Sequence, residues 1–362
     1  VGSDDFLVSG GNFHGGTALI EVEDSLGISG GIFTSTSATL QLEGNTGISG
    51  GTFDHNSGMV LFQASGVRRY TSMAPAPRFH QVQVNMGNSK RLIIRSGDTL
   101  LVEQKIILSN GQLNTGILAV DDTCLVDASW DNGDATLVFM GDNHAWLGFN
   151  GGDWSGNDVQ VSLSANTDTV FAYDQDGDQA IQLGKRDYAL SINGGCLAFE
   201  SGIDVDLDFD NILLQPGGTL IGTDQEITFQ GNYSNTGGTY VHNQGTFTFN
   251  GGGWRTFACN KKSDNPFYNL QVNLGNKKVL TVNSGDSLYV MNKALLTNGQ
   301  IQTGVLAVDD TCLVNSSWDN GNGTLVFVGD DNGWYGFNNG SWNGNQFNVS
   351  LTANTDTVFV FD

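Results

Sequence analysis

The chain has 362 residues and a formal net charge of −23 at pH 7, with 50 glycines, 4 prolines and only 15 lysines and arginines. So few basic residues exclude a protein that binds nucleic acid or an anionic membrane surface through clustered positive charge. The acidic surplus instead favours solubility and an affinity for cations. Hydrophobic residues make up 39% of the chain, which is enough for a buried core, and no apolar run is long enough to span a membrane.

The composition predicts strands and turns rather than helices. The chain has 32 aspartates and 36 asparagines but only 6 glutamates. Aspartate and asparagine are poor helix formers and, like glycine, tolerate the left-handed backbone conformations of tight turns. Short alternations of apolar and polar residues recur, such as TLQLEG and TFTFNG, and glycine or asparagine ends them. This alternation is typical of strands with one buried face, so we predict an all-β fold.

The first predicted strands repeat every 20 residues. The phrase GISGGxF ends at Phe33 and again at Phe53, and a shorter form, SGGNF, ends at Phe13. Three short strands and three corners use about 20 residues, which is one coil of a β-solenoid, so the chain would hold about 18 coils. Coils stacked about 4.8 Å apart would place the three phenylalanines in one internal stack.

We predict a right-handed parallel β-helix whose coils form two tandem units. The alternative is a pair of tandem β-sandwiches, because alternating strands and turn signals suit both architectures. A sandwich gives no reason for a Gly-Gly corner at constant spacing, and the solenoid is therefore the favoured interpretation.

A longer repeat divides the chain into the two predicted units, 1–174 and 175–362. Residues 79–174 are identical to residues 267–362 at 59 of 96 positions without a gap, and the words LAVDDTCLV, SWDNG and ANTDTVF recur. The chain begins at Val1 and stops at Asp362, the partner position of Asp174. We therefore expect a processed or excised piece of a longer array.

The four cysteines give no support for a zinc or redox site, because no Cys-x-x-Cys pair is present. Cys124 and Cys312 lie in the same recurring word, and we expect both to be small buried hydrophobic residues. A disulfide between Cys196 and Cys259 stays open.

The segment IDVDLDFDN, residues 203–211, alternates apolar and acidic residues. On a strand its four carboxylates would lie on one face, about 7 Å apart. They would form either a solvated strand face or a row that binds Ca²⁺ or basic groups of a partner. The pairs Asp121-Asp122 and Asp309-Asp310 are further candidates. The candidate ligands of the row are Asp204, Asp206, Asp208 and Asp210.

The segment DQDGD resembles the start of a calcium loop of the EF-hand or dockerin kind, in which aspartates at the first, third and fifth positions supply oxygen ligands. The matching residues are Asp174, Asp176 and Asp178. Gln179 and Lys185 depart from the pattern, since they replace the usual glycine and the bidentate glutamate. A calcium-tied linker between the units and a plain acidic turn therefore both stay open, and Ca²⁺ is the one cofactor considered.

Each unit carries three tryptophans at matched positions, among them those in GDNHAWLGFNGGDWSGN and GDDNGWYGFNNGSWNGN. Aromatic rings beside asparagine and aspartate suit sugars, because a ring face covers the pyranose and the polar groups bind its hydroxyls. The alternative is aromatic packing that covers irregular coils. The candidate glycan-binding residues are Trp146, Trp154, Trp334 and Trp342.

The sequence predicts no catalytic residues and no enzyme. No nucleophile elbow, HExxH motif or phosphate-binding loop occurs. Polysaccharide cleavage would need Arg, Lys or His near the acids, and these residues are scarce. His55 and His242 share an HN corner, which we interpret as turn chemistry. Arg68-Arg69 and Lys261-Lys262 are short basic stretches that either pair with acidic rows of a neighbouring chain or are solvated.

Several words resemble modules of large repetitive surface proteins secreted by bacteria: HNSGMVLFQAS before RFHQVQVNMGN, and HNQGTFTFNGG before PFYNLQVNLGN. The SGGTF corner is similar to coils in adhesin and autotransporter passenger regions. The resemblance implies an exported, elongated stalk, fibre or adhesin at the cell surface, and it supplies no catalytic residues.

We therefore expect a non-enzymatic, extracellular structural segment of a bacterial surface stalk, fibre or adhesin. Ladders between coils would stiffen it, and its acidic faces would keep it soluble until cations or a partner bridge them. The expected partners are other copies of the chain, end to end or side by side, further repeats of a longer chain, and surface glycans. Nucleic acid and membrane insertion are not expected. A carbohydrate-binding module on the same fold is the alternative, and a polysaccharide lyase or hydrolase is a third hypothesis.

Overall fold

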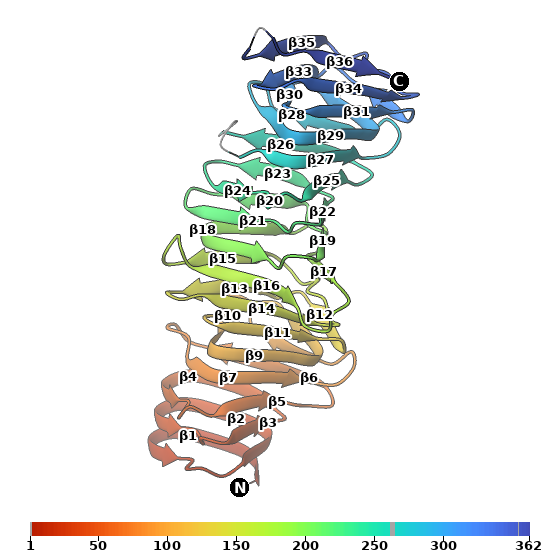
Figure 1. Cartoon of the computed structure of the whole chain (residues 1–362). Coiled ribbons are helices and arrows are strands. Elements are labelled where there is room, and N and C mark those ends of the chain that lie inside the picture. The colour runs from red at the N-terminus through yellow and green to blue at the C-terminus, as the bar shows by residue number, and fades with distance from the viewer. Residues whose placement is uncertain (1, 261–264, 354) are drawn as a thin grey trace. The chain divides into compact units, whose positions relative to one another are not determined.

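The computed structural model describes residues 2–260, 265–353 and 355–362 (Figure 1), so the basic stretch Lys261-Lys262 lies outside the described residues. The chain folds as an all-β parallel β-solenoid of about 16 turns, with about 22 residues in each turn. The alternative of tandem β-sandwiches is wrong, because the described ladders within each unit run parallel, whereas sandwich sheets are antiparallel. The handedness of the coil stays a prediction.

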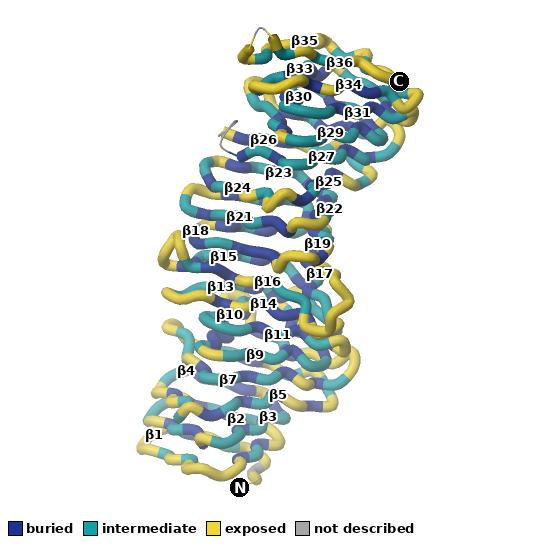
Figure 2. Tube along the Cα trace, viewed as in Figure 1, coloured by how far each residue is buried: buried dark blue, intermediate teal, exposed yellow. Residues whose placement is uncertain are grey.

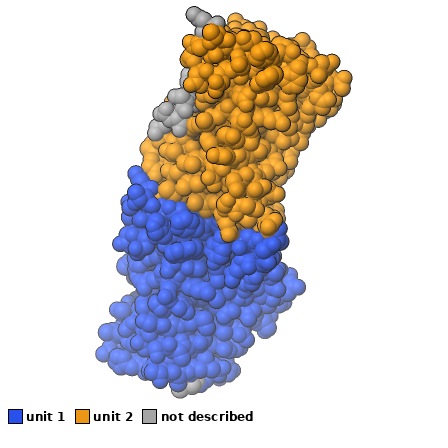
Figure 3. Space-filling model, viewed as in Figure 1, with its two compact units in different colours: residues 1–178 blue, residues 179–362 orange. Residues whose placement is uncertain are grey.

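The chain forms two compact units, Val1–Asp178 and Gln179–Asp362, which Figure 3 colours separately. The boundary falls a few residues after the end of the sequence repeat at position 174. Every regular element of the described residues is a strand, and none of them belongs to a helix with the length and apolar character needed to cross a membrane.

The strands of the first unit are β1 (Gly2–His14), β2 (Ile20–Thr34), β3 (Thr39–Leu42), β4 (Asn45–Asp54), β5 (Met59–Phe62), β6 (Val67–Ser72), β7 (Arg78–Asn85), β8 (Arg91–Ile94), β9 (Thr99–Asn114), β10 (Ile117–Val120), β11 (Thr123–Asp127), β12 (Trp130–Gly133), β13 (Thr136–Gly141), β14 (Ala145–Asn150), β15 (Val159–Leu163) and β16 (Thr169–Asp174).

The strands of the second unit are β17 (Ala180–Leu183), β18 (Ala189–Phe199), β19 (Asp204–Leu207), β20 (Asn211–Leu214), β21 (Gly218–Ile221), β22 (Glu226–Phe229), β23 (Asn232–Asn235), β24 (Thr239–Val241), β25 (Thr246–Asn250), β26 (Trp254–Cys259), β27 (Phe267–Asn273), β28 (Val279–Val282), β29 (Ser287–Gln302), β30 (Val305–Val308), β31 (Thr311–Asn315), β32 (Trp318–Asn320), β33 (Thr324–Gly329), β34 (Gly333–Asn338), β35 (Gln346–Leu351) and β36 (Val358–Phe361).

The Gly-Gly corners of the first coils stack directly on one another. Gly11, Gly31 and Gly51 have φ angles of 73°, 72° and 67°, in the left-handed region that favours glycine. A Cβ atom on Gly31 would lie 2.2 Å from the carbonyl oxygen of Gly11, and one on Gly51 would lie 2.7 Å from the Gly31 oxygen. The constant spacing of these glycines therefore reflects both the backbone conformation and the close approach of successive coils.

The predicted internal phenylalanine stack is confirmed. Phe13 pairs with Phe33, and Phe33 pairs with Phe53, in the parallel ladders of β1, β2 and β4. The ring centroids are 5.1 and 5.8 Å apart, and the ring planes lie within 18° of each other. Phe33 is completely buried, so like residues lie above like residues in the core.

The coils are longer than the first repeats predicted. Met59 of β5 pairs with Gln81 of β7, and Ala145 of β14 pairs with Val170 of β16. The corners between these strands hold more residues than the corners of the first coils. The prediction of about 18 coils is therefore replaced by about 16 turns.

Buried residues alternate with half-buried or exposed residues along many of the strands, as Figure 2 shows by colour. Cys124 and Cys312 are completely buried, as predicted, and burial raises the pKa of each thiol to about 12. Cys196 and Cys259 are not joined by a disulfide.

We expect Gly31→Ala to destabilise the first coils by about 1–3 kcal/mol, because the added methyl group must sit in a left-handed conformation against the Gly11 carbonyl. Native-state hydrogen exchange of the β1, β2 and β4 amides measures this locally. Gly10→Ala is the matched control: a Cβ atom at Gly10 meets nothing within 4 Å, so a change below about 0.5 kcal/mol is expected. Equal protection in the two variants would contradict the stacking of the corners.

Candidate functional site

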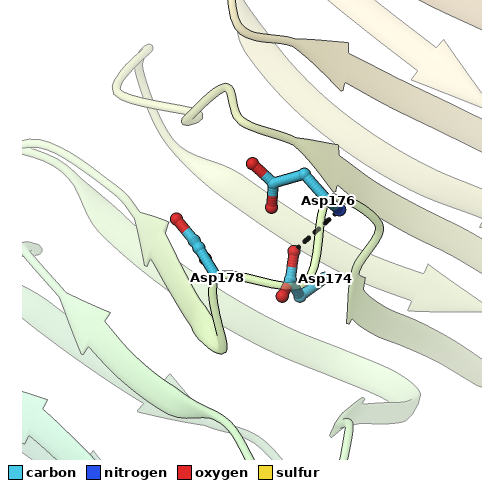
Figure 4. A group of neighbouring side chains, drawn as sticks. All are labelled: Asp174, Asp176 and Asp178. Atoms are coloured by element: carbon cyan, nitrogen blue, oxygen red, sulfur yellow. Dashed lines mark hydrogen bonds between the residues drawn. The ribbon is translucent and has the colours of Figure 1, made fainter.

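The three aspartates of the DQDGD segment lie together in the turn that follows β16 (Figure 4). Each offers a carboxylate oxygen within 4.8 Å of the others. Asp174 is half-buried, and Asp176 and Asp178 are exposed. The Oδ1 atom of Asp174 accepts hydrogen bonds from the backbone N–H groups of Asp176, at 3.1 Å, and Gly177, at 3.2 Å. The turn therefore brings the three predicted calcium ligands together.

The charges of this turn repel one another. A hydrogen bond to the Asp174 side chain, slight desolvation and the charge of Asp178 raise the pKa of Asp176 above its ordinary value. A divalent cation would relieve this repulsion, and carboxylate oxygens are the ligands that Ca²⁺ prefers. With one oxygen from each, the three carboxylates supply three of the six to eight ligands that Ca²⁺ takes, so second carboxylate oxygens, backbone carbonyls or water would complete the shell.

The acidic row at residues 204–210 has the predicted alternation, and the apolar residues between the aspartates are buried. Its carboxylates have separate partners, however. Asp208 forms an ion pair of 3.4 Å with Arg186, and Asp204 accepts a hydrogen bond of 3.2 Å from the backbone N–H of Glu226. In the described parts of the chain, three such ligand atoms converge only in the DQDGD turn. Cation binding by the row stays a prediction.

Asp206 and Asp210 are the half-buried members of this row that have no ion pair among the described residues. The Oδ1 atom of Asp206 is buried and accepts no hydrogen bond from any residue that the structure describes. Burial and the charge of Asp208 raise the pKa of Asp206 above its ordinary value. Burying a carboxylate oxygen without a hydrogen-bond partner costs free energy. A cation bound at Asp206 would therefore gain more binding free energy than a cation bound elsewhere in the row.

The four candidate tryptophans divide into exposed and covered rings. Trp146 and Trp334 are 41% and 45% exposed, whereas Trp154 is only 1% exposed. Trp342 is half-buried, and its Nε1 atom is buried. Trp154 therefore presents no ring face to solvent, and packing accounts for its position. Trp146 and Trp334 are the pair whose rings reach solvent, and glycan binding by the four tryptophans stays a prediction.

Trp146 belongs to an outward-facing column of side chains in the first unit. It lies in β14, between Thr123 of β11 and Phe171 of β16, its partners in the two parallel ladders. Phe171 is 41% exposed, and its ring centroid is 6.2 Å from that of Trp146. His144 also contacts Phe171, with the centroids 5.7 Å apart. Two large aromatic rings therefore lie side by side on the solvent face of the sheet.

The second unit repeats this column. Trp334 of β34 lies between Thr311 of β31 and Phe359 of β36. The Trp334 and Phe359 rings are stacked, with centroids 4.9 Å apart and planes 25° apart. Phe359 is 42% exposed. The sequence identified the tryptophans but not the phenylalanines that extend them.

A glycine beside each column leaves room for a third aromatic ring to approach the backbone of the sheet. A Cβ atom on Gly148 would lie 2.6 Å from the Tyr173 hydroxyl oxygen and 2.6 Å from Leu125 Cδ2. A Cβ atom on Gly336 would lie 2.5 Å from the Phe361 ring. We call each set of three rings an aromatic platform. The platforms are Trp146, Phe171 and Tyr173 in the first unit, and Trp334, Phe359 and Phe361 in the second.

An acidic groove of about 400 Å³ adjoins the platform of the first unit. Trp146 forms one wall, and four carboxylates, an amide and an imidazole form the rest. The lining residues other than Trp146 are Glu103, Asp121, Asp122, Asp142, Asn143 and His144.

Arg78 crosses one end of this groove. Its guanidinium lies 3.3 Å from the Glu103 carboxylate and 3.0 Å from the Asp121 carboxylate, and His55 Nε2 lies 3.2 Å from Glu103. The sequence did not bring these residues together, because they lie on different coils. The groove combines acids with arginine and histidine, but the guanidinium is already engaged by two carboxylates.

Asp121 is a half-buried carboxylate of the groove. Burial raises the pKa of Asp121 above its ordinary value, and the charges of Glu103 and Asp142 add to this effect, while Arg78 opposes it. The Oδ1 atom of Asp121 is buried and accepts no hydrogen bond from the described residues. The groove is therefore a region of negative charge in which this oxygen has no donor in the described part of the chain.

The comparisons with known proteins identify no relative. No family model matches the chain, and no curated protein and no solved structure was found to be similar to it. The parallel ladders and the length of the turns establish the fold, but they do not identify the family of the protein.

We expect Ca²⁺ to stabilise the wild-type chain and to stabilise Asp176→Asn much less, because the variant loses one of three converging ligands. At 10 mM Ca²⁺ and a dissociation constant of about 10⁻⁴ to 10⁻³ M, the gain for the wild type is about 1.4–2.7 kcal/mol, measured by thermal unfolding. The raised pKa of Asp176 means that lowering the pH should weaken binding earlier than for an ordinary aspartate.

The control for this experiment is Asp4→Asn, which removes an exposed carboxylate far along the chain from the turn. Without Ca²⁺, Asp176→Asn should be at least as stable as the wild type, since it loses a repelling charge. An equal calcium effect in the wild type and Asp176→Asn would contradict the site.

Sedimentation velocity in the same titration tests cation bridging between chains, and a monomer at every Ca²⁺ concentration would contradict such bridging.

Proposed function

We propose that the chain is a non-enzymatic structural segment of an extracellular bacterial surface stalk, fibre or adhesin. The observation that carries this proposal is the stacking of coils within each unit through parallel ladders, from the Gly31 corner to the buried phenylalanine stack. The resemblance of the repeat words to secreted surface proteins supports the same role.

A force along such a segment would be carried by the backbone hydrogen bonds between its coils. Each strand pairs with the equivalent strand of the next coil, so a coil is held by the hydrogen bonds of all its strands together. A solenoid of this kind is stabilised by nearest-neighbour interfaces between repeats. The net charge of −23 keeps such surfaces apart in solution, because like charges repel.

We expect the chain to yield turn by turn when it is stretched from its ends. One turn of about 22 residues releases about 7 nm of extended chain, so single-molecule force spectroscopy should show steps in multiples of about 7 nm. A protein without this internal ladder would instead unfold in one large step per domain.

Gly31→Ala serves as the matched variant, because it should lower the force of the steps that release the first coils and leave the others unchanged. A single cooperative step in the wild type would contradict a role that depends on stacked coils.

Antibodies against the chain should label intact cells of its source, and recovery in the cytoplasmic fraction would contradict the proposed location.

A second candidate function is glycan binding through the aromatic platforms. It is favoured by the exposure of Trp146 and Trp334 at equivalent ladder positions, each extended by a neighbouring phenylalanine. Soluble proteins rarely expose large contiguous aromatic surface without a binding role. A platform of this kind matches the apolar face of a pyranose, and the acidic and amide groups beside it can bind hydroxyls.

We expect the double variant Trp146→Ala with Trp334→Ala to lose glycan binding, by at least about 10-fold, because truncating a central aromatic contact typically costs 1–3 kcal/mol. Glycan arrays followed by titration calorimetry measure this. The control is Trp254→Ala, which removes a tryptophan that is 76% exposed and belongs to neither platform. Equal loss in the control, or wild-type affinity in the double variant, would contradict a role for the platforms.

A further inference from the structure

We infer that the ligand of the aromatic platforms is a cationic glycan, namely a polymer of amino sugars with free ammonium groups. This inference rests on the second proposed function, that the platforms bind glycans. It specifies the class of glycan from the charges around the rings.

The second platform is a cluster of three exposed rings. The rings of Trp334 and Phe359 are stacked within 25° of parallel, and Phe361 meets Trp334 edge-on, with the ring planes 70° apart and the centroids 6.4 Å apart. The cluster therefore presents apolar surface on the outside of the sheet in more than one direction. It offers more apolar surface than the one ring face that an ammonium group needs, so sugar rings can pack against it as well.

An acidic groove lies beside the first platform. Four carboxylates line it next to Trp146, and Arg78 contacts two of them, Glu103 and Asp121. The groove therefore keeps a surplus of negative charge next to an exposed ring. Among the described residues, the buried Oδ1 atom of Asp121 has no hydrogen-bond donor, and an N–H donor of a ligand would satisfy it.

The second platform also has acids beside it, but the set differs. Met291 and Asp331 stand where the first unit has Glu103 and Asn143, and proline stands at position 266, where the first unit has Arg78. A Cβ atom on Gly329 would lie 1.6 Å from Asp309 Oδ1, so Asp309 lies against the start of the turn that holds Asp330 and Asp331 and leads into Trp334. Burial raises the pKa of Asp309, and the charges of Asp330, Asp331 and Asp310 add to this effect. The second platform therefore has acids beside it and lacks the arginine of the first.

Other classes of glycan match these charges less well. A uronic acid or sulfated polymer would bring negative charge against four carboxylates and would be repelled. A neutral sugar would stack on the rings and donate hydroxyl hydrogen bonds to the carboxylates, but it would lack the stronger hydrogen bonds that a charged donor makes. A pyranose with an ammonium group uses both features, since ring and charge are then recognised side by side. Lys105 pairs with Thr123, and Lys293 pairs with Thr311, so in each column the threonine lies between the lysine and the tryptophan. Because like charges repel, we expect the ammonium group of the ligand to face the acidic turn before each tryptophan and not the lysine.

The test compares three probes by titration calorimetry on the full chain: a glucosamine hexamer, an N-acetylglucosamine hexamer and a galacturonic acid hexamer. At about pH 6, amines are protonated and ordinary aspartates are ionised. In low salt the glucosamine hexamer should bind at least about 10-fold more tightly than its N-acetylated counterpart, and the galacturonic acid hexamer should not bind. The preference should shrink in about 0.5 M salt, because screening weakens the charge term and leaves the ring stacking.

The charge and the rings are then tested separately. Asp330→Asn with Asp331→Asn should reduce the preference for the glucosamine hexamer and leave binding of the N-acetylated hexamer unchanged. Asp4→Asn, which removes an exposed carboxylate on β1 outside every candidate site, is the matched control and should change neither. Trp334→Ala should weaken both hexamers.

The outcomes distinguish this inference from the function on which it rests. Equal binding of the two hexamers, independent of salt, would overturn the ammonium inference and leave glycan binding in place. No binding of any sugar by the wild type would overturn both. Binding of hexalysine as tight as that of the glucosamine hexamer, and unaffected by Trp334→Ala, would show a site for polycations and would also overturn the inference.

Discussion

Each coil of this protein has to lie flat on the coil before it, because the backbone groups of its strands find their hydrogen-bond partners there and not within the coil. The corners set how closely the coils approach. At Gly31 and Gly51 the backbone of one coil touches the backbone of the preceding coil, and no side chain fits between them. Where the corners stack, equivalent residues fall above one another, and the buried phenylalanine column follows from this.

The same constraint orders the outer surface. A solenoid places residues from successive coils in outward columns as well as inward ones, so an exposed aromatic residue has an exposed neighbour about 4.8 Å away in the next coil. This explains how Trp146 acquires Phe171, and Trp334 acquires Phe359, as parts of a surface. The platforms are thus a consequence of ladder register. The proposed role of the platforms in recognition depends on the carboxylates that lie beside them in both units.

The acidic groups divide according to how they are held. On β19 the outward aspartates are separated by the strand geometry and take individual partners. In the turn after β16, three aspartates converge because the Asp174 side chain holds the backbone of the turn. Beside Trp146, acids from different coils gather around Arg78. The composition of the chain is uniformly acidic, but the fold makes three different electrostatic environments from it.

The sequence by itself determined the all-β solenoid, the internal phenylalanine stack, the burial of Cys124 and Cys312 and the outward direction of the 203–211 aspartates. These features depend on local alternation and on the spacing of corners, which can be read along the chain. Tertiary structure decided the length of the turns, the burial of Trp154 beside the exposure of Trp146, and the meeting of Arg78 with Asp121. Contacts between coils depend on how many residues each corner holds, and alternation along one strand carries no information about that number.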